Sequence, residues 1–304
     1  FRYHQAQMAA AASLPDALKS LLERSDVHMS NRLQTLEKIA RLIDGGAERL
    51  SVVSDFDHTL TRAIDDDGEP LAVTHNVFGD TFKLPDMKQK STQKKYTAYS
   101  KESAGSERLA MLEAWWGKKH DDVVTGGLTR EQFNDLAAKT DIRLRDSSSD
   151  LLQSLSDAAV PTLLFSAGLS DAISFVLTKQ MDSVPEAVHI IGNAMEFDEN
   201  NKLVSFKTPL LHPFNKSAAI IDKASPLLSS ISPRPHLLVL GDSMGDLTME
   251  KGLDKDRQNT LRIGFLNGKL DDLKQFLAGF DIVIASDQSI ELPTRIVKEI
   301  VGAK

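Results

Sequence analysis

The stretch Leu50-Ser-Val-Val-Ser-Asp-Phe-Asp-His-Thr-Leu-Thr61 joins an apolar run to two closely spaced carboxylates. The run at 50–53 is typical of a short strand buried in a parallel sheet. If the extended geometry continues, Asp55 and Asp57 share one side of the chain and Phe56 points into the core. Open α/β sheets bind ligands outside the carboxyl ends of their strands, so this is a favourable place for a site. Taken alone, such a stretch is more often an acidic loop after a buried strand than a catalytic site.

The composition is that of an ordinary soluble globular protein, with 41% hydrophobic and 26% charged residues in a chain of 304. The length favours about two domains. A net charge of −7 would repel a nucleic-acid polymer, although a local cation or lysine still allows a small phosphorylated substrate. With no cysteine and no run of 18 apolar residues, we expect a cytoplasmic protein without a membrane span. We also expect a monomer.

Apolar runs alternate with helical periodicity after residue 150, which predicts an α/β fold. Further strands are expected at 161–165, 188–191, 236–240, 261–265 and 281–285, with a hairpin at 197–206. Helices are expected at 14–24, 31–43, 106–119, 129–139, 151–158, 170–179, 216–224, 270–277 and 292–301. We therefore predict a core of residues 1–64 and 150–304 around a mainly parallel sheet. Residues 65–149, which include the capping box Thr129-Arg-Glu-Gln132, are predicted to form an inserted helical cap.

Polar, small-residue turns follow three of these strands. They are Asp55-Phe-Asp57, Ser166-Ala-Gly168 and Gly241-Asp-Ser-Met-Gly-Asp246, and Phe214-Asn-Lys216 lies between the last two. Each has an ordinary alternative when taken alone: a strand-to-helix turn, a surface lysine or helix-capping acids. Since all lie at or beside the carboxyl ends of predicted parallel strands, we expect them to form one site.

This combination resembles the haloacid dehalogenase-like phosphohydrolase superfamily, and more closely its cytosolic 5′-nucleotidase III family. That family comprises pyrimidine and 7-methylguanosine-phosphate-specific 5′-nucleotidases. The resemblance runs from about residue 50 to near the C-terminus and implies a three-layer, Rossmann-like core. The similar stretches are Ser54-Asp-Phe-Asp-His-Thr-Leu-Thr61, Thr74-His-Asn76, Trp115-Trp-Gly-Lys-Lys-His120, Phe165-Ser-Ala-Gly168, Asn193-Ala-Met-Glu-Phe-Asp198, Phe214-Asn-Lys216, Leu240-Gly-Asp-Ser-Met-Gly-Asp-Leu247 and Ile263-Gly-Phe-Leu-Asn267.

The chemistry of phosphoryl transfer gives each motif a role. A carboxylate nucleophile divides hydrolysis into two easier steps through an aspartyl-phosphate, and we assign that nucleophile to Asp55. Asp57 is the expected acid that protonates the leaving ribose 5′-oxygen and then the base that activates water. Thr59 is expected to support the loop.

Acidic groups packed against a phosphate dianion require a cation, because unit charges ~4 Å apart repel by about 4 kcal/mol at an effective dielectric of 20. Magnesium, which prefers oxygen ligands, is the expected cofactor. Its expected ligands are a carboxylate oxygen of Asp55, the backbone carbonyl of Asp57, and Asp242. Asp246 is expected to orient waters or Lys216.

The phosphoryl group needs positive charge and neutral donors. Lys216 is expected to neutralise it together with Asp55. The hydroxyl of Ser166 and the backbone N–H groups of Ala167 and Gly168 are expected to donate to its equatorial oxygens.

The cap is expected to determine which base is bound. In the resembling family a cap glutamate and an aromatic slot read the base. Ser100 stands near the place of that glutamate, and Glu102 follows two residues later. Trp115 or Trp116 is expected to stack on the base, while the other lies in the core because adjacent helical residues diverge by ~100°. Lys119 completes the expected nucleoside contacts.

These observations predict a magnesium-dependent 5′-nucleotidase for pyrimidine nucleoside monophosphates or 7-methylguanosine monophosphate. Transfer to a nucleoside acceptor is an expected side activity. One alternative is a phosphatase for another small phosphomonoester, such as a phosphosugar or phosphoserine. Another is a non-catalytic nucleotide-binding module, against which the intact set Asp55, Asp57, Lys216 and Asp242 argues.

Overall fold

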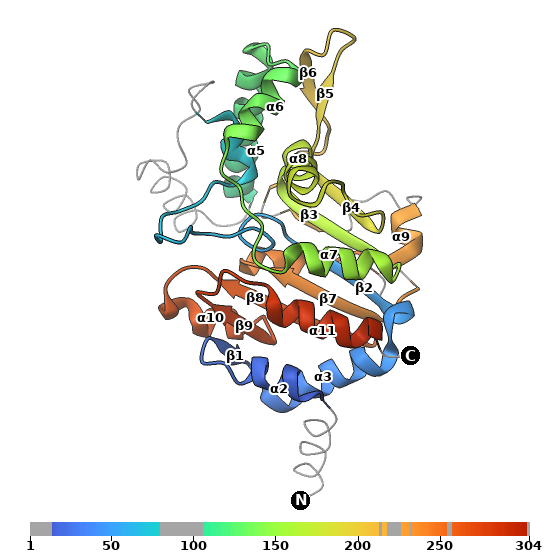
Figure 1. Ribbon diagram of the computed structural model, residues 1–304. Coiled ribbons are helices and arrows are strands. Elements are labelled where there is room, and N and C mark those ends of the chain that lie inside the picture. Colours follow the sequence, from blue (N-terminus) through green and yellow to red (C-terminus); the bar gives the residue numbers. More distant parts are fainter. Residues whose placement is uncertain are drawn as a thin grey trace, which may run out of the picture.

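The computed structural model describes residues 14–79, 106–212, 215–217, 226–231, 233–253 and 257–302. A seven-stranded sheet in the order β1-β9-β8-β7-β2-β3-β4 forms its centre (Figure 1). The strands are β1 (Val27–Met29), β2 (Leu50–Ser54), β3 (Thr162–Leu169), β4 (Val188–Asn193), β7 (His236–Gly241), β8 (Asn259–Leu266) and β9 (Ile282–Ala285). All neighbours pair in parallel except β1 and β9. The predicted α/β fold with a mainly parallel sheet is confirmed.

The central strand β2 is buried along its whole length, as expected for a strand with both faces covered. Its side chains alternate between two apolar clusters: Val52 lies in the larger one and Val53 in a smaller one on the opposite face. The neighbouring strand β7 divides in the same way, with Leu238 in the larger cluster and Val239 in the smaller. The sheet therefore needs helices on both faces.

Helices cover the two faces of the sheet (Figure 1). The face of Val52 is covered by α2 (Asp16–Leu22), α3 (Arg32–Gly45), α7 (Ser148–Asp157), α8 (Ser170–Met181) and α11 (Glu291–Gly302). The other face is covered by α9 (Pro226–Ile231) and α10 (Leu273–Leu277). Short 3-10 helices lie at η1 (Ala47–Arg49), η2 (Thr74–Phe78), η4 (Met244–Thr248) and η5 (Leu270–Asp272). The result is a three-layer arrangement.

A second group of elements lies apart from the sheet, at the top of Figure 1. It contains α5 (Ser106–Thr125), α6 (Arg130–Lys139) and the hairpin of β5 (Met195–Phe197) and β6 (Leu203–Phe206). The capping box begins α6: Gln132 N donates to Thr129 Oγ1 at 3.2 Å, and Thr129 N donates to Gln132 Oε1 at 2.9 Å. The hairpin therefore joins the helices although its residues lie outside the predicted cap range of 65–149.

Several predicted boundaries differ from the structure. Strand β3 continues to Leu169 instead of ending at 165. Its pairing with β4 is irregular after Phe165 and resumes where Leu169 lies opposite Asn193. The edge strand β1 and helix α9 were not predicted from the sequence. The helix expected at 216–224 lies outside the described residues except at 216–217, which are not helical. Among the described helices, none has the length and apolar character to cross a membrane.

The packing of α3 on the sheet gives a stability prediction. Ile39 is fully buried on this helix, whereas Arg41 is exposed. Ile39→Ala should lower the free energy of unfolding by about 2–5 kcal/mol, since it leaves a cavity against the sheet. Arg41→Ala should change it by less than about 0.5 kcal/mol. Urea denaturation measures both values, and equal losses would contradict this placement of α3.

Candidate active site

The site lies beside β2, where successive strands of the chain begin to be added on opposite sides of the sheet. Strands β3 and β4 follow β2 on one side, and β7 lies on its other side. Asp55 directly follows β2 and Asp242 directly follows β7, so both leave the sheet at the same edge. The Asp55 N–H donates to the Leu240 carbonyl at 2.9 Å, which continues the ladder to the first aspartate. Such a position is the usual ligand site of an open α/β sheet.

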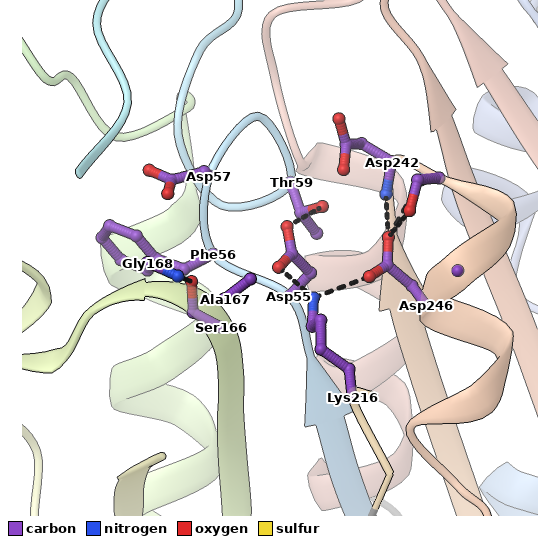
Figure 2. Close-up of polar contacts among 12 residues, drawn as sticks. Asp55, Phe56, Asp57, Thr59, Ser166, Ala167, Gly168, Lys216, Asp242 and Asp246 are labelled. Atoms are coloured by element: carbon purple, nitrogen blue, oxygen red, sulfur yellow. Dashed lines mark hydrogen bonds and ion pairs between the residues drawn. The ribbon is translucent and has the colours of Figure 1, made fainter. Parts of the chain in front are cut away.

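The ammonium of Lys216 lies between two carboxylates (Figure 2). Its Nζ is 2.5 Å from Asp55 Oδ1 and 2.7 Å from Asp246 Oδ1. The Lys216 side chain is only 3% exposed. Burial lowers the pKa of the Lys216 ammonium, but the charges of Asp55 and Asp246 outweigh this and raise it above its usual value. Lys216 is therefore a buried, permanently charged group.

Asp246 is fixed by further donors. Its Oδ2 accepts from the backbone N–H of Asp242 at 3.2 Å, the N–H of Ser243 at 2.9 Å and the Ser243 hydroxyl at 2.8 Å. Gly241 allows this close approach, since a Cβ at that position would lie 2.4 Å from Asp246 Cβ. Asp246 thus anchors both Lys216 and the turn that carries Asp242.

The acidic cluster fits a divalent metal ion. Carboxylate oxygens of Asp55, Asp242 and Asp246 lie within 4.8 Å of one another. Burial raises the pKa of Asp55 to about 7, partly offset by Lys216, and burial also raises that of Asp242 well above its ordinary value. One ammonium does not balance three carboxylates, and a hard cation would. Because Asp246 already accepts four hydrogen bonds, Asp55 and Asp242 are the more accessible ligands.

The carboxylate of Asp57 lies outside this cluster and has its own partner. Thr74 donates to it twice, from its backbone N–H at 2.9 Å and from its hydroxyl at 2.6 Å. Burial raises the pKa of Asp57, while the two Thr74 bonds act in the opposite direction. Phe56, between the two aspartates, is fully buried as predicted. Thr74 was not identified as a site residue from the sequence, although it opens the family-like stretch Thr74-His-Asn76.

The Ser166–Gly168 segment lies beside the aspartates (Figure 2). Ser166 is 1% exposed, and its Oγ accepts the Gly168 N–H at 2.9 Å. A Cβ on Gly168 would lie 1.9 Å from Thr74 Oγ1 and 2.9 Å from Asp57 Oδ2. Position 168 therefore requires glycine, because a side chain there would collide with Thr74 and Asp57. The Gly168 N–H donates to Ser166 and so acts on the site only through that serine.

A buried arginine supports the loop after β2. Thr59 Oγ1 donates to Asp55 Oδ2 at 3.2 Å, which agrees with its expected supporting position. Arg145 donates to the carbonyls of Thr59 at 2.9 Å and His58 at 2.7 Å, to Asn267 Oδ1 at 2.6 Å, and to the carbonyl of Asp287. Its role was not predicted, because nothing in the local sequence distinguishes Arg145 from a surface arginine.

Comparisons with known proteins identify the family of this chain. Residues 58–301 match the family model described as pyrimidine 5′-nucleotidase (UMPH-1). The chain belongs to the pyrimidine 5′-nucleotidase family. It is 30% identical to the Xenopus laevis 7-methylguanosine phosphate-specific 5′-nucleotidase A over 90% of this chain and 94% of that protein.

Two further proteins are also similar to this chain. A Caenorhabditis elegans protein whose name assigns it to cytosolic 5′-nucleotidase 3 is 30% identical, over 96% of this chain and 80% of its own length. The crystal structure of cytosolic 5′-nucleotidase IIIB bound to cytidine has a TM-score of 0.79 and 26% identity. That comparison covers 95% of this chain and 98% of the other.

The cap residues predicted from the resemblance to this 5′-nucleotidase family are only partly described. Lys119 lies on α5 and is 9% exposed, and burial lowers the pKa of its ammonium to about 8. Trp115 and Trp116 lie on the same helix, but their side chains are outside the described part. Ser100 and Glu102 are outside the described residues altogether.

The acidic cluster predicts a pH-dependent effect of metal on stability. Because burial raises the pKa of Asp55 to about 7, its ionisation destabilises the metal-free protein as the pH rises from about 4 to 7. A divalent cation binds the ionised cluster, so it should raise the melting temperature more at pH 8 than at pH 5. Thermal denaturation with magnesium chloride or with a chelator measures this difference.

The matched variant is Asp242→Asn, which should lose most of the metal-induced increase at pH 8. An increase of the same size at both pH values, or one that persists in this variant, would contradict the proposed location of the metal.

Proposed function

We propose that this chain is a magnesium-dependent 5′-nucleotidase that hydrolyses nucleoside 5′-monophosphates through an aspartyl-phosphate on Asp55. The observation that supports this most strongly is the pairing of Lys216 with Asp55 and Asp246 beside Asp242, in a chain of the pyrimidine 5′-nucleotidase family. A buried carboxylate beside a fixed ammonium suits a nucleophile that receives a phosphoryl group.

In the first step, Asp55 attacks phosphorus while Lys216 offsets the negative charge of both reactants. Thr59 and Lys216 each donate to one oxygen of Asp55, which fixes the orientation of the carboxylate. The Ser166 hydroxyl and the Ala167 backbone form the side of the site that would face the equatorial oxygens, while the Gly168 N–H donates to Ser166 Oγ. When bound by Asp55, the Asp57 carbonyl and Asp242, magnesium supplies positive charge against the phosphate.

Asp57 is proposed to move the proton. Burial favours its protonated form, which suits donation to the leaving ribose 5′-oxygen. The resulting carboxylate then takes a proton from the water that hydrolyses the aspartyl-phosphate. Thr74 fixes the carboxyl group during both steps through its two hydrogen bonds.

The substrate class is proposed from the family. The relatives named above are 5′-nucleotidases, one is specific for 7-methylguanosine phosphate, and the solved structure contains cytidine. We propose a pyrimidine nucleoside monophosphate or 7-methylguanosine monophosphate as substrate. We also propose a side activity in which the phosphoryl group on Asp55 is transferred to a nucleoside hydroxyl instead of to water.

The segment 65–149 is proposed as the specificity cap. Its expected base contacts are Trp115, Trp116, Lys119, Ser100 and Glu102.

The cellular location and the oligomeric state are also proposed. Two of the related proteins carry the word cytosolic in their names, so we propose a cytoplasmic location. We also propose that the chain acts as a monomer.

A substrate panel tests this function. With magnesium, phosphate release from CMP, UMP or 7-methylguanosine monophosphate should exceed release from sugar phosphates and phosphoserine, and a chelator should abolish it. Asp55→Asn is the background control and should reduce kcat by more than roughly 10³. Preference for a non-nucleotide phosphomonoester would refute the substrate class. Full activity of Asp55→Asn would refute the proposed nucleophile.

A further inference from the structure

We propose that Asn193 is a positioning residue that orients the Ser166 hydroxyl toward the phosphoryl group. The inference rests on the function proposed above and extends it to a residue with no role in the mechanism so far. Asn193 is the last residue of β4, next to β3 in the sheet, and is 1% exposed.

Every hydrogen-bonding group of the Asn193 amide is used. Its Nδ2 donates to the carbonyl of Ala167 at 2.7 Å and to that of Leu211 at 2.9 Å. Its Oδ1 accepts the N–H of Leu211 at 2.9 Å. The side chain therefore joins the Ser166–Gly168 segment to a position five residues before Lys216. Since two donors and an acceptor are matched, the amide has one orientation.

The bond to Ala167 fixes a peptide plane. In a trans peptide the C=O and the following N–H point in opposite directions. With the Ala167 carbonyl held by Asn193, the Gly168 N–H points away from Asn193, and it donates to Ser166 Oγ at 2.9 Å. By holding the Ala167 carbonyl, Asn193 sets the direction of the Gly168 N–H, which donates to Ser166 Oγ.

The orientation of the serine hydroxyl follows from that donor. An oxygen that accepts one hydrogen bond directs its own O–H toward a different acceptor. Within the described part of the chain, Ser166 Oγ accepts the Gly168 N–H and donates to no acceptor. Its proton is therefore available to the substrate. Asn193 acts on the phosphoryl group only through this chain of Ala167, Gly168 and Ser166.

A double-mutant cycle with Ser166→Ala tests this mechanism. The probe is orthovanadate with magnesium, and its affinity is measured by inhibition and by thermal shift. Asn193→Ala should weaken vanadate binding and lower kcat by about 10–100-fold. In the Ser166→Ala background the same change should have almost no effect, because the hydroxyl that Asn193 orients is gone. Inhibition by the nucleoside product should stay unchanged.

Asn259→Ala is the matched control. Asn259 is also a buried asparagine, 5% exposed, whose Nδ2 donates to a backbone carbonyl, that of Lys38, at 2.9 Å. It begins β8, at the opposite end of the strands from the site. This variant should lower the melting temperature and leave kcat and vanadate affinity unchanged.

Asn193→Asp replaces Asn193→Ala if the latter fails to fold, since it keeps the shape of the side chain and removes both N–H donors. Equal losses with and without Ser166, or full vanadate affinity in a folded variant, would overturn the inference. Wild-type protein that binds vanadate but hydrolyses no nucleotide would refute only the proposed substrate. Wild-type protein that does not bind vanadate would overturn both proposals.

Discussion

The buried ammonium of Lys216 is the interaction on which the site depends. It contacts the carboxylates of Asp55 and Asp246 at 2.5 and 2.7 Å, and all three side chains are less than 10% exposed. Buried charges are tolerated only when they are paired, and removing one partner leaves the other uncompensated. With Asp242 also present, the site still carries excess negative charge, which is the physical reason that it fits a divalent cation.

The sheet makes this convergence possible. Because β2 and β7 are parallel neighbours, the residues that follow them leave the sheet side by side. Both faces are covered by helices, so the strands are apolar and the polar groups collect at the carboxyl edge. Hydrogen bonds then hold these groups in place. Thr74 donates to the carboxylate of Asp57, and Arg145 donates to the backbone carbonyls of His58 and Thr59 that follow.

The sequence predicted the features that depend on local patterns. Apolar runs located β2 and β7, and the motifs at their ends indicated Asp55, Asp242 and Asp246. The separate motif Phe214-Asn-Lys216 added Lys216 to the same hypothesis, and the structure brings all four residues together. Edge strand β1 was missed because Val27–Met29 is too short to show alternation. The extension of β3 was missed because Ser166–Gly168 has the composition of a turn, whereas the strand continues past it and pairs with β4 again at Leu169.

The roles of Thr74, Arg145 and Asn193 were not predicted, although Thr74 and Asn193 each begin a stretch similar to the 5′-nucleotidase family. Each is a single polar residue whose importance comes from a partner distant in the chain, such as Arg145 with His58 or Asn193 with Ala167. Tertiary structure alone brings these groups together, so no local spacing could indicate them.

The role of Asp55 as the nucleophile is tested most directly by trapping its aspartyl-phosphate. Protein quenched with acid during turnover of a nucleoside monophosphate would be digested, and its peptides analysed by mass spectrometry. We expect a phosphorylated peptide whose modified residue is Asp55, and we expect it to be absent when substrate is omitted. Phosphorylation of a different residue, or turnover with no phosphorylated enzyme under conditions that preserve acyl phosphates, would contradict this role of Asp55.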